Sequence, residues 1–332
     1  MTCKAKVGWF KFRLPPSAFL LCALAAGGLA AQEYPARPVR MVIPFPAGGS
    51  IDIVARSISQ RWVALLGQQI VIDNRAGAAG AIGTQLVAQA AADGYTLLYG
   101  NAGPLAIAPH LSPKLGYDLF KDFAPVSQTT SSPFVVFAST ALPAKNAQEL
   151  IAYAKQRPGQ LAYASSGVGS GLHLMGELFK SVAGIDLLHV PFKGMGQASP
   201  EFASGRVPIA VSTVPGILPH VKSGRMRGIV SSGTRRSTLL PDVQTCVEAN
   251  LPGFCASSFH AVVAPAKTPK AVIAKLQQTL SATLSNPELR EQLAAREDSQ
   301  AVGGTPEELA RLMRSEYERY GKVIKANNIK SE

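Results

Sequence analysis

The sequence predicts an α/β protein of two doubly wound domains with a cleft between them. Strand-like runs alternate with helical runs through most of the 332 residues, which is typical of parallel sheets covered by helices. Two separate series of such units occur, and each contains a glycine-rich turn between a strand and a helix. Because a further strand and three helices follow the second series, we expect the chain to cross between the domains twice.

The first series begins with a strand-like run at residues 39–43. The turn at residues 47–50 joins it to a helix whose apolar positions recur at helical spacing, at Ile51, Val54, Ala55, Ile58, Trp62 and Leu65. Further strands are predicted at residues 70–72 and 96–99, with a helix over residues 81–92 between them. Three glycines are interpreted as helix-packing positions, Gly77, Gly80 and Gly83.

The second series begins with a strand at residues 134–137, and the next helix starts with a capping-box pattern of Asn146 and Glu149. A strand at residues 161–164 leads through the glycine-rich turn at residues 165–171 into a second helix. Three shorter strands follow, at residues 187–190, 207–211 and 227–230. These elements predict a second sheet that is built separately from the first.

A strand at residues 259–263 and three helices complete the chain. Each of these helices has a proline at its start, at Pro269, Pro287 and Pro306. We expect them to pack on the first domain, which leaves a two-stranded hinge near Phe134 and Phe259. The predicted boundaries are residues 32–133 with 256–332 for the first domain and residues 134–255 for the second.

The first 31 residues have the order of a secretory signal peptide. Four basic residues without an acid precede an apolar run at residues 18–29, and small residues follow through Ala31. The alternative is a retained membrane anchor, for which the apolar run is short. We therefore expect residues 1–31 to be removed and the mature chain to reach the periplasm.

Charge and motifs exclude several function classes. The formal net charge is +12, but the basic residues are scattered, with Arg235-Arg236 the only adjacent pair, so no nucleic-acid groove is predicted. Neither glycine-rich turn matches a nucleotide-binding or serine-hydrolase motif. No metal-ligand spacing connects the five histidines, His110, His173, His189, His220 and His260. We therefore expect no enzyme, no metal and no cofactor.

Two cysteines remain after export, Cys246 and Cys255. They bracket a short loop in which Pro252 and Gly253 supply a turn, and an oxidising periplasm permits a disulfide there. Spacing alone cannot establish the geometry that a bridge needs, so a disulfide and two free thiols are both open.

The two glycine-rich turns are the candidate ligand site. Each follows a strand and precedes a helix, where free backbone N–H groups and the helix dipole favour an anion. Hydroxyl donors are added by Ser50, Ser165, Ser166 and Ser170. Because ligands of open α/β sheets bind beyond the carboxyl ends of the strands, we expect the turns to face each other and clamp a carboxylate. The alternative is that each turn only connects a strand to a helix.

Two titratable residues adjoin these turns. His173 lies in the first turn of its helix, where it could donate to a carboxylate, or could cap or pack. Asp52 would repel an anion unless it orients water or stabilises the helix end. These two are the only candidate acid–base groups for an exported hydrolase or isomerase. Lys193 is interpreted as a solvated charge.

Short motifs occur in a fixed order along the mature chain, at residues 34–39, 44–52, 74–77, 93–97, 122–126, 191–194, 240–243 and 303–308. In this order they resemble the Bug family, the substrate-binding proteins of tripartite tricarboxylate transporters. The resemblance covers essentially the whole mature chain. It implies a type II-like periplasmic binding protein that closes on a ligand, often a dicarboxylate or tricarboxylate.

The resemblance also implies the residues that line the ligand, partly through bound waters. In the first domain these are Phe45, Ala47, Gly48, Gly49, Ser50 and Asp52, with Asn101 on the adjacent loop. In the second domain they are Ser165, Ser166, Gly167, Ser170 and His173. Ser212 and Thr213 stand where family members often carry an acidic or amide residue. Without an acid there, a neutral or acidic far end of the ligand fits better than an amine.

The resemblance implies capture of a small organic acid and its delivery to two integral membrane subunits of a transporter. A sensor that presents the bound carboxylate to a membrane receptor is an alternative on the same fold, and an exported hydrolase or isomerase is another. We expect a monomer that binds no nucleic acid.

Overall fold

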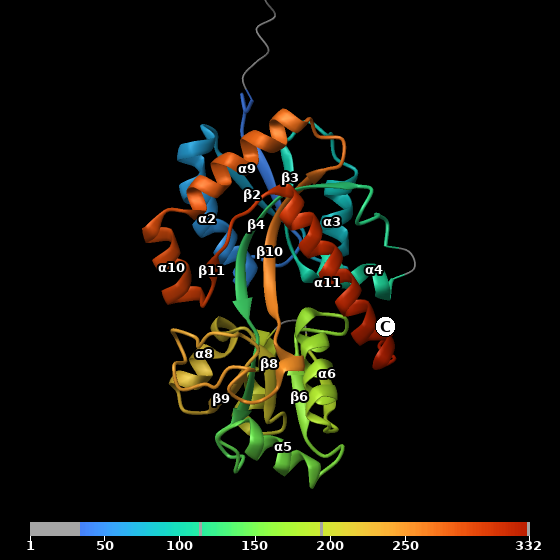
Figure 1. The fold of residues 1–332 in the computed structure, drawn as a ribbon, viewed down its shortest axis with the longest axis vertical. Helices are drawn as coiled ribbons and strands as arrows, with labels where there is room; N and C mark the ends of the chain where they lie inside the picture. The colour runs from blue at the N-terminus through green and yellow to red at the C-terminus, as the bar shows by residue number, and fades with distance from the viewer. Residues whose placement is uncertain (1–33, 113–114, 193–194, 331–332) are drawn as a thin grey trace, which may run out of the picture. The chain divides into compact units, whose positions relative to one another are not determined.

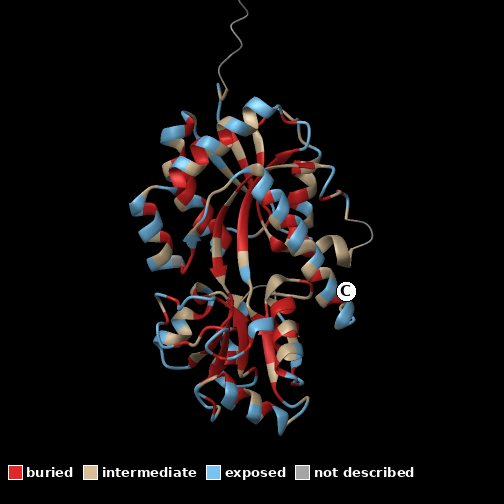
Figure 2. Cartoon of the chain, in the orientation of Figure 1, coloured by how far each residue is buried: buried red, intermediate tan, exposed pale blue. Residues whose placement is uncertain are grey.

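The computed structural model describes residues 34–112, 115–192 and 195–330. The predicted signal peptide and Lys193 lie outside these ranges. From Arg37 onward the chain folds around two β-sheets, one of six strands and one of five (Figure 1). Each sheet has its own helices and its own buried apolar core (Figure 2).

The first sheet has the strand order β11-β4-β10-β3-β1-β2. Its strands are β1 (Val39–Ile43), β2 (Ile70–Asn74), β3 (Thr96–Asn101), β4 (Phe123–Pro133), β10 (Ser257–Pro265) and β11 (Gln300–Ala301). β1 pairs parallel with both β2 and β3, whereas β10 runs antiparallel to both β3 and β4. The carboxyl ends of β1, β2 and β3 therefore share one edge.

The second sheet has the order β7-β6-β8-β5-β9. Its strands are β5 (Val135–Ser139), β6 (Ala162–Ser165), β7 (Leu188–Pro191), β8 (Ile209–Ser212) and β9 (Met226–Ser231). β6 pairs parallel with β7 and β8, while β5 is antiparallel to β8 and β9. The carboxyl ends of β6, β7 and β8 again share an edge.

Helices cover both sheets. They are α2 (Ser50–Leu66), α3 (Ala81–Ala88), α4 (Ala108–Leu111), α5 (Ala147–Lys155), α6 (Gly171–Ala183), α7 (Ser199–Ser204), α8 (Val214–Lys222), α9 (Lys270–Leu284), α10 (Pro287–Glu297) and α11 (Pro306–Ala326). α9 packs against α2 and β4, and α11 packs against β4, so both tail helices cover the first sheet (Figure 1). The indole N–H of the fully buried Trp62 on α2 donates to Thr279 Oγ1 on α9 at 2.9 Å.

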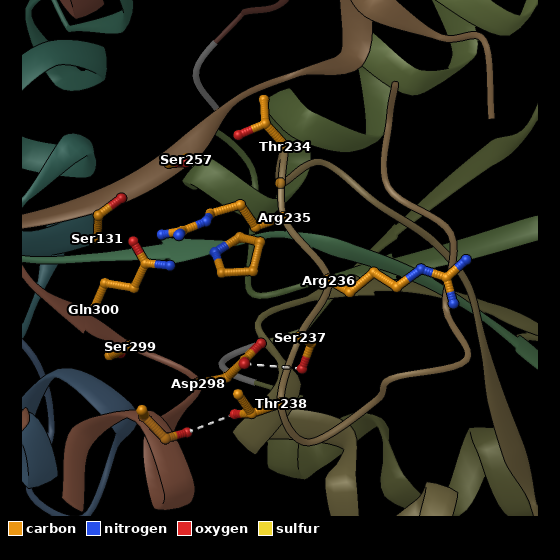
Figure 3. A pocket seen from close by; sticks show the side chains of 13 residues that line it. Ser131, Thr234, Arg235, Arg236, Ser237, Thr238, Ser257, Asp298, Ser299 and Gln300 are labelled. Carbon is orange, nitrogen blue, oxygen red and sulfur yellow. Dashed lines mark hydrogen bonds between the residues drawn. The ribbon is translucent and has the colours of Figure 1, made fainter. Parts of the chain in front are cut away.

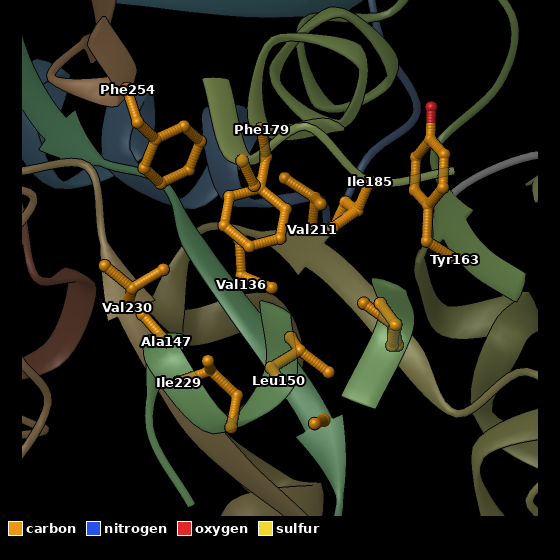
Figure 4. Packing of buried hydrophobic residues seen from close by; sticks show 14 of the residues in the cluster. Val136, Ala147, Leu150, Tyr163, Phe179, Ile185, Val211, Ile229, Val230 and Phe254 are labelled. Carbon is orange, nitrogen blue, oxygen red and sulfur yellow. The ribbon is translucent and has the colours of Figure 1, made fainter. Parts of the chain in front are cut away.

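The second core fills the space between its sheet, α5, α6 and the disulfide loop (Figure 4). Phe179 of α6 meets Phe254 of the loop edge to face, with ring centroids 5.3 Å apart. Cys246 and Cys255 are bridged, with Cα atoms 5.4 Å apart, which decides between the two alternatives that the sequence left open. The bridge holds the loop that carries Phe254 against the core.

The expected parallel pairing holds for β1, β2 and β3 and for β6, β7 and β8. The crossing strands β4, β5 and β10 are instead antiparallel to their neighbours, because they connect the two sheets and do not return through a helix. One detail of the helix prediction is wrong. Leu65 was expected on the buried face of α2, but it is 49% exposed and Leu66 is buried instead. The exact domain boundaries stay a prediction.

Candidate functional site

The first glycine-rich turn lies at the shared edge of β1, β2 and β3. The turn follows β1, while Asn74 and Asn101 are the last residues of β2 and β3. The ring of Phe45 lies close to the next turn, since a Cβ on Gly80 would be 3.3 Å from its Cζ atom. Strand ends therefore gather the predicted residues of the first domain in one place.

The N-terminus of α2 opens onto this turn without a side-chain cap. Its N-cap residue is Gly49, which has no side chain to accept a hydrogen bond from the first helical turn. Residues 47–50 are exposed, and Gly48 has φ +79°, a conformation that glycine adopts without strain. The backbone N–H groups that begin α2 are thus left for a ligand or water.

Asp52 stabilises the conformation of the first glycine-rich turn. It is 2% exposed, and its carboxylate accepts from Gly48 N–H at 2.9 Å, Arg56 Nε at 2.9 Å and Asn74 Nδ2 at 3.0 Å. Burial opposes its ionisation, but these hydrogen bonds and the charge of Arg56 outweigh burial, so the pKa of Asp52 is lowered. The negative charge of Asp52 is compensated by these donors, which explains how an acidic side chain can lie beside a turn that binds an anion.

Asn74 is a supporting residue that the site prediction missed. Its Nδ2 donates to Phe45 O at 3.1 Å as well as to Asp52, and its Oδ1 accepts from Arg56 at 3.1 Å. The sequence did mark this residue, because Asn74 begins one of the family motifs. No sequence pattern showed that its side chain contacts Phe45 and Asp52.

The second glycine-rich turn connects β6 to α6 and is held by hydrogen bonds from its own residues. Ser170 is the N-cap, and its Oγ accepts from His173 N–H at 3.2 Å. Gly169 N–H donates to His173 Nδ1 at 3.1 Å. Nδ1 is therefore an acceptor and cannot donate to a ligand. Nδ1 of His173 therefore stabilises the turn by accepting a hydrogen bond within it.

A stacked pair of imidazoles supports the same turn. The rings of His173 and His189 lie 3.9 Å apart and nearly parallel, at 7°. His189 Nε2 lies 2.6 Å from Ser165 Oγ, which also accepts from Gly167 N–H at 3.2 Å. Burial lowers the pKa of both histidines, and for His189, with the charges of His173 and Lys180 adding to burial, to about 3. Both rings are thus neutral at neutral pH. The sequence carried no signal for His189.

Ser212 is the last residue of β8, which pairs with β6, and Thr213 follows it. Ser212 is buried, whereas Thr213 is half-buried and precedes α8 without using its side chain as a cap. Ser166 is also half-buried, and its hydroxyl has no hydrogen-bond partner within the described ranges. Among the predicted residues of this sheet, Ser166 and Thr213 therefore carry the available hydroxyls.

The second turn also contacts elements of the first sheet. A Cβ on Gly169 would lie 2.6 Å from Leu111 Cδ1 of α4, so the two residues are in close contact. On α6, Leu174 is buried in the core of the first sheet together with Phe259 and Tyr320. The structure brings the second turn close to the first sheet, while the facing of the two turns stays a prediction.

Within the described ranges, no helix has the length and hydropathy to cross a bilayer. The same residues hold no group of three histidine, cysteine or acidic side chains arranged as metal ligands.

Residues 54–329 match the family described as the tripartite tricarboxylate transporter family receptor. The chain belongs to this family. Protein BugT of Bordetella pertussis is 36% identical over 94% of this chain and 96% of its own length. A protein from the tcbD–tcbE intergenic region of Pseudomonas sp. strain P51 is also 36% identical, over 88% of this chain and 87% of its own. The resemblance to the Bug family is confirmed.

Several solved structures are similar to this chain over most of its length. The periplasmic binding protein BugD has a TM-score of 0.80 at 31% identity, covering 90% of this chain and all of its own. R. palustris Rpa4515 with adipate gives 0.83 at 34% identity, covering 90% and 99%. MatC from Rhodopseudomonas palustris with bound malate gives 0.78 at 33% identity, covering 88% and 100%. The predicted fold class, two α/β domains of the periplasmic binding protein type, is confirmed.

Proposed function

We propose that this member of the receptor family captures a small carboxylate between its two glycine-rich turns. The observation that carries the proposal is the N-terminus of α2. It has no side-chain cap, its preceding turn is stabilised by Asp52, and its first backbone N–H groups are left for a ligand. Family members with adipate and with malate support a carboxylate as the ligand.

The proposed ligand-binding residues divide into two groups. Donors to the carboxylate come from the first turn of α2, Ser50, Ser166, Thr213 and the amide of Asn101, whose Oδ1 is already occupied by Gly103 N–H at 3.0 Å. The turns that present them are held by Asp52, Ser165, Ser170 and His173. Hydrogen bonds to a charged group contribute roughly 1.5–3 kcal/mol each, so a few of them suffice for a micromolar site of about 8 kcal/mol.

The same division argues against the hydrolase or isomerase hypothesis. A general base must reach a substrate proton, yet Asp52 and His173 Nδ1 accept from backbone N–H groups. At the far end, Ser212 and Thr213 offer no charge to an amine, which favours a second acidic or neutral group on the ligand.

We further propose that the chain is exported to the periplasm, loses its signal peptide and delivers its ligand to two membrane subunits. The family description as a transporter receptor supports delivery rather than sensing. Uptake of the ligand by cells that carry the membrane subunits should then require this chain. Uptake that persists at the same rate without it would contradict delivery.

The binding step is tested by calorimetry on the mature chain with a panel of carboxylates that includes adipate and malate. We expect one saturable ligand, and at least tenfold weaker binding in Gly49→Val. Gly49 has φ −73°, and a Cβ there would lie at an ordinary 3.4 Å from Pro46 O, so the fold should accept the change.

Ala64→Val is the matched control, since Ala64 is exposed farther along the same helix. Its affinity should equal that of the unchanged protein. Failure of every carboxylate to bind, or full affinity in Gly49→Val, would contradict the proposed site.

A further inference from the structure

A cavity lies beside the strands that cross between the two sheets (Figure 3). Its volume is about 130 Å³. It is lined by Ser131 and Pro133 of β4, Ser257 of β10, the loop after β9 and the segment from Asp298 to Gln300. No residue of either glycine-rich turn lines it, so it is separate from the proposed carboxylate site.

One wall of the cavity carries a buried carboxylate with one oxygen unsatisfied. Asp298 follows α10 and is 8% exposed. Its carboxylate accepts from Ser237 Oγ, which lies 2.8 Å from Oδ1, and from the backbone N–H of Thr238, whereas its Oδ2 is buried and has no hydrogen-bond partner of good geometry among the described residues. A buried polar atom without a partner destabilises the folded chain, so a donor from outside the chain would stabilise this arrangement.

An unpaired cation lies in the same cavity. Figure 3 shows the guanidinium of Arg235 extending toward Ser131 and Gln300, while the neighbouring Arg236 points the opposite way. Arg236 pairs with Glu248 at 3.0 Å, but Arg235 has no ion pair within the described ranges. The cavity is therefore lined by an exposed guanidinium without an ion pair and by a buried carboxyl group with one unsatisfied oxygen.

We propose that this cavity is a second binding site, for a small organic acid that carries an adjacent hydrogen-bond donor. The carboxylate of such a ligand pairs with Arg235, because guanidinium groups bind carboxylates in bidentate geometry. Its ammonium or hydroxyl group donates to Asp298 Oδ2. An amino acid or hydroxy acid of about the size of glycine or glycolate is small enough for this volume.

The site takes its walls from elements on both sides of the crossing. Arg235 belongs to the loop after β9 of the second sheet, and Asp298 to the segment before β11 of the first. Two side-chain hydrogen bonds already join the loop after β9 to α10 and the residue that follows it, from Ser237 to Asp298 and from Thr238 Oγ1 to Ala294 O at 3.2 Å. A ligand held by both ends adds a third connection at the same place.

The test uses the mature chain with glycine and glycolate as probes, followed by ligand-observed NMR. We expect saturable binding of either probe. Acetate, which lacks the donor, and methylammonium, which lacks the carboxylate, should bind at least tenfold more weakly. Arg235→Ala and Asp298→Asn should each weaken binding of the bound probe by tenfold or more.

Two control variants test whether the probes bind in this cavity and nowhere else. Arg236→Ala removes a neighbouring guanidinium that points away from the cavity, and Gly49→Val alters the first turn, so both should leave probe binding unchanged. No saturable binding of glycine or glycolate would show that only water occupies the cavity and would overturn the proposal. Equal binding in Arg235→Ala, which changes an exposed side chain and threatens no packing, would also overturn it.

Discussion

At the scale of single residues, Asp52 shows why a side chain can be recognised in a sequence and still not be understood there. Its position in the first turn of a helix was readable, and so was the conflict between its charge and a bound anion. The resolution depends on Asn74, which is 22 residues away along the chain and meets Asp52 only because β1 and β2 pair in parallel. Sequence periodicity predicts elements but not which side chains meet across them.

Asp52→Asn should weaken ligand binding and lower the free energy of unfolding by about 1–3 kcal/mol at neutral pH, since an amide cannot accept all three hydrogen bonds. The lowered pKa of Asp52 means that its stabilisation is present above the unfolded pKa and is lost as pH falls through the folded value. Urea unfolding at several pH values should therefore show a difference that is constant near neutrality and shrinks below about pH 4.

The exposed Asp242 provides the control, because Asp242→Asn removes one carboxylate from the surface. It should leave both stability and binding close to those of the unchanged protein. A stability loss in Asp52→Asn that stays the same at acid pH would contradict the role assigned to its hydrogen bonds.

At the scale of elements, the sequence predicted the parallel strands better than the crossing strand β4. β1, β3 and β6 are short runs of apolar residues that end at glycine or polar turns, and hydropathy finds them. β4 is the longest strand, yet its middle reads Ser127, Gln128, Thr129, Thr130 and Ser131, which has no apolar alternation. It is held as a strand by hydrogen bonds to β10 and β11 and by cover from α9 and α11, and none of these is local.

The elements around the second turn are joined by the imidazole stack, with His173 on α6 and His189 on β7. His189 also stacks on Tyr163 of β6 at 5.0 Å, and Tyr163 donates to Glu177, which pairs with Lys180. These surroundings favour neutral imidazoles, because burial and a neighbouring ring both penalise a proton.

His189→Gln should change how stability depends on pH. In the unchanged protein the unfolded His189 takes up a proton below about pH 6.5, while the folded residue, with a pKa of about 3, does not. The unfolded state therefore binds more protons, and stability falls as pH drops from 6.5 toward 3. Glutamine cannot titrate, so urea unfolding at pH 7, 6, 5 and 4 should give a shallower fall.

The exposed-surface control for this series is Gln197→Ala, which changes no titratable group. It should reproduce the pH dependence of the unchanged protein. If His189→Gln gave the same slope as that control, the histidine stack would not be the source of the acid sensitivity.

At the scale of the whole molecule, the family motifs predicted the architecture because they mark the strand ends and turns that the fold reuses. They could not predict how firmly the two sheets are joined, which depends on side chains outside those motifs. Leu174 on α6 is fully buried in the core of the first sheet, and Ser237 and Thr238 tie the loop after β9 to the end of α10. The buried cores of the two sheets are thus connected by packing at one place and by hydrogen bonds at another.

Leu174→Ala should loosen this connection, because removing a fully buried leucine side chain costs about 2–5 kcal/mol. Trp62 makes the consequence measurable: outside the predicted signal peptide it is the only tryptophan, and it is buried between α2 and α9 of the first sheet. In the unchanged protein, tryptophan fluorescence and far-UV circular dichroism should report one coincident unfolding transition. In Leu174→Ala the second sheet should unfold first, so circular dichroism should change before fluorescence. Coincident transitions in the variant would show that the hydrogen bonds of Ser237 and Thr238 are enough, without Leu174, to make the two sheets unfold together.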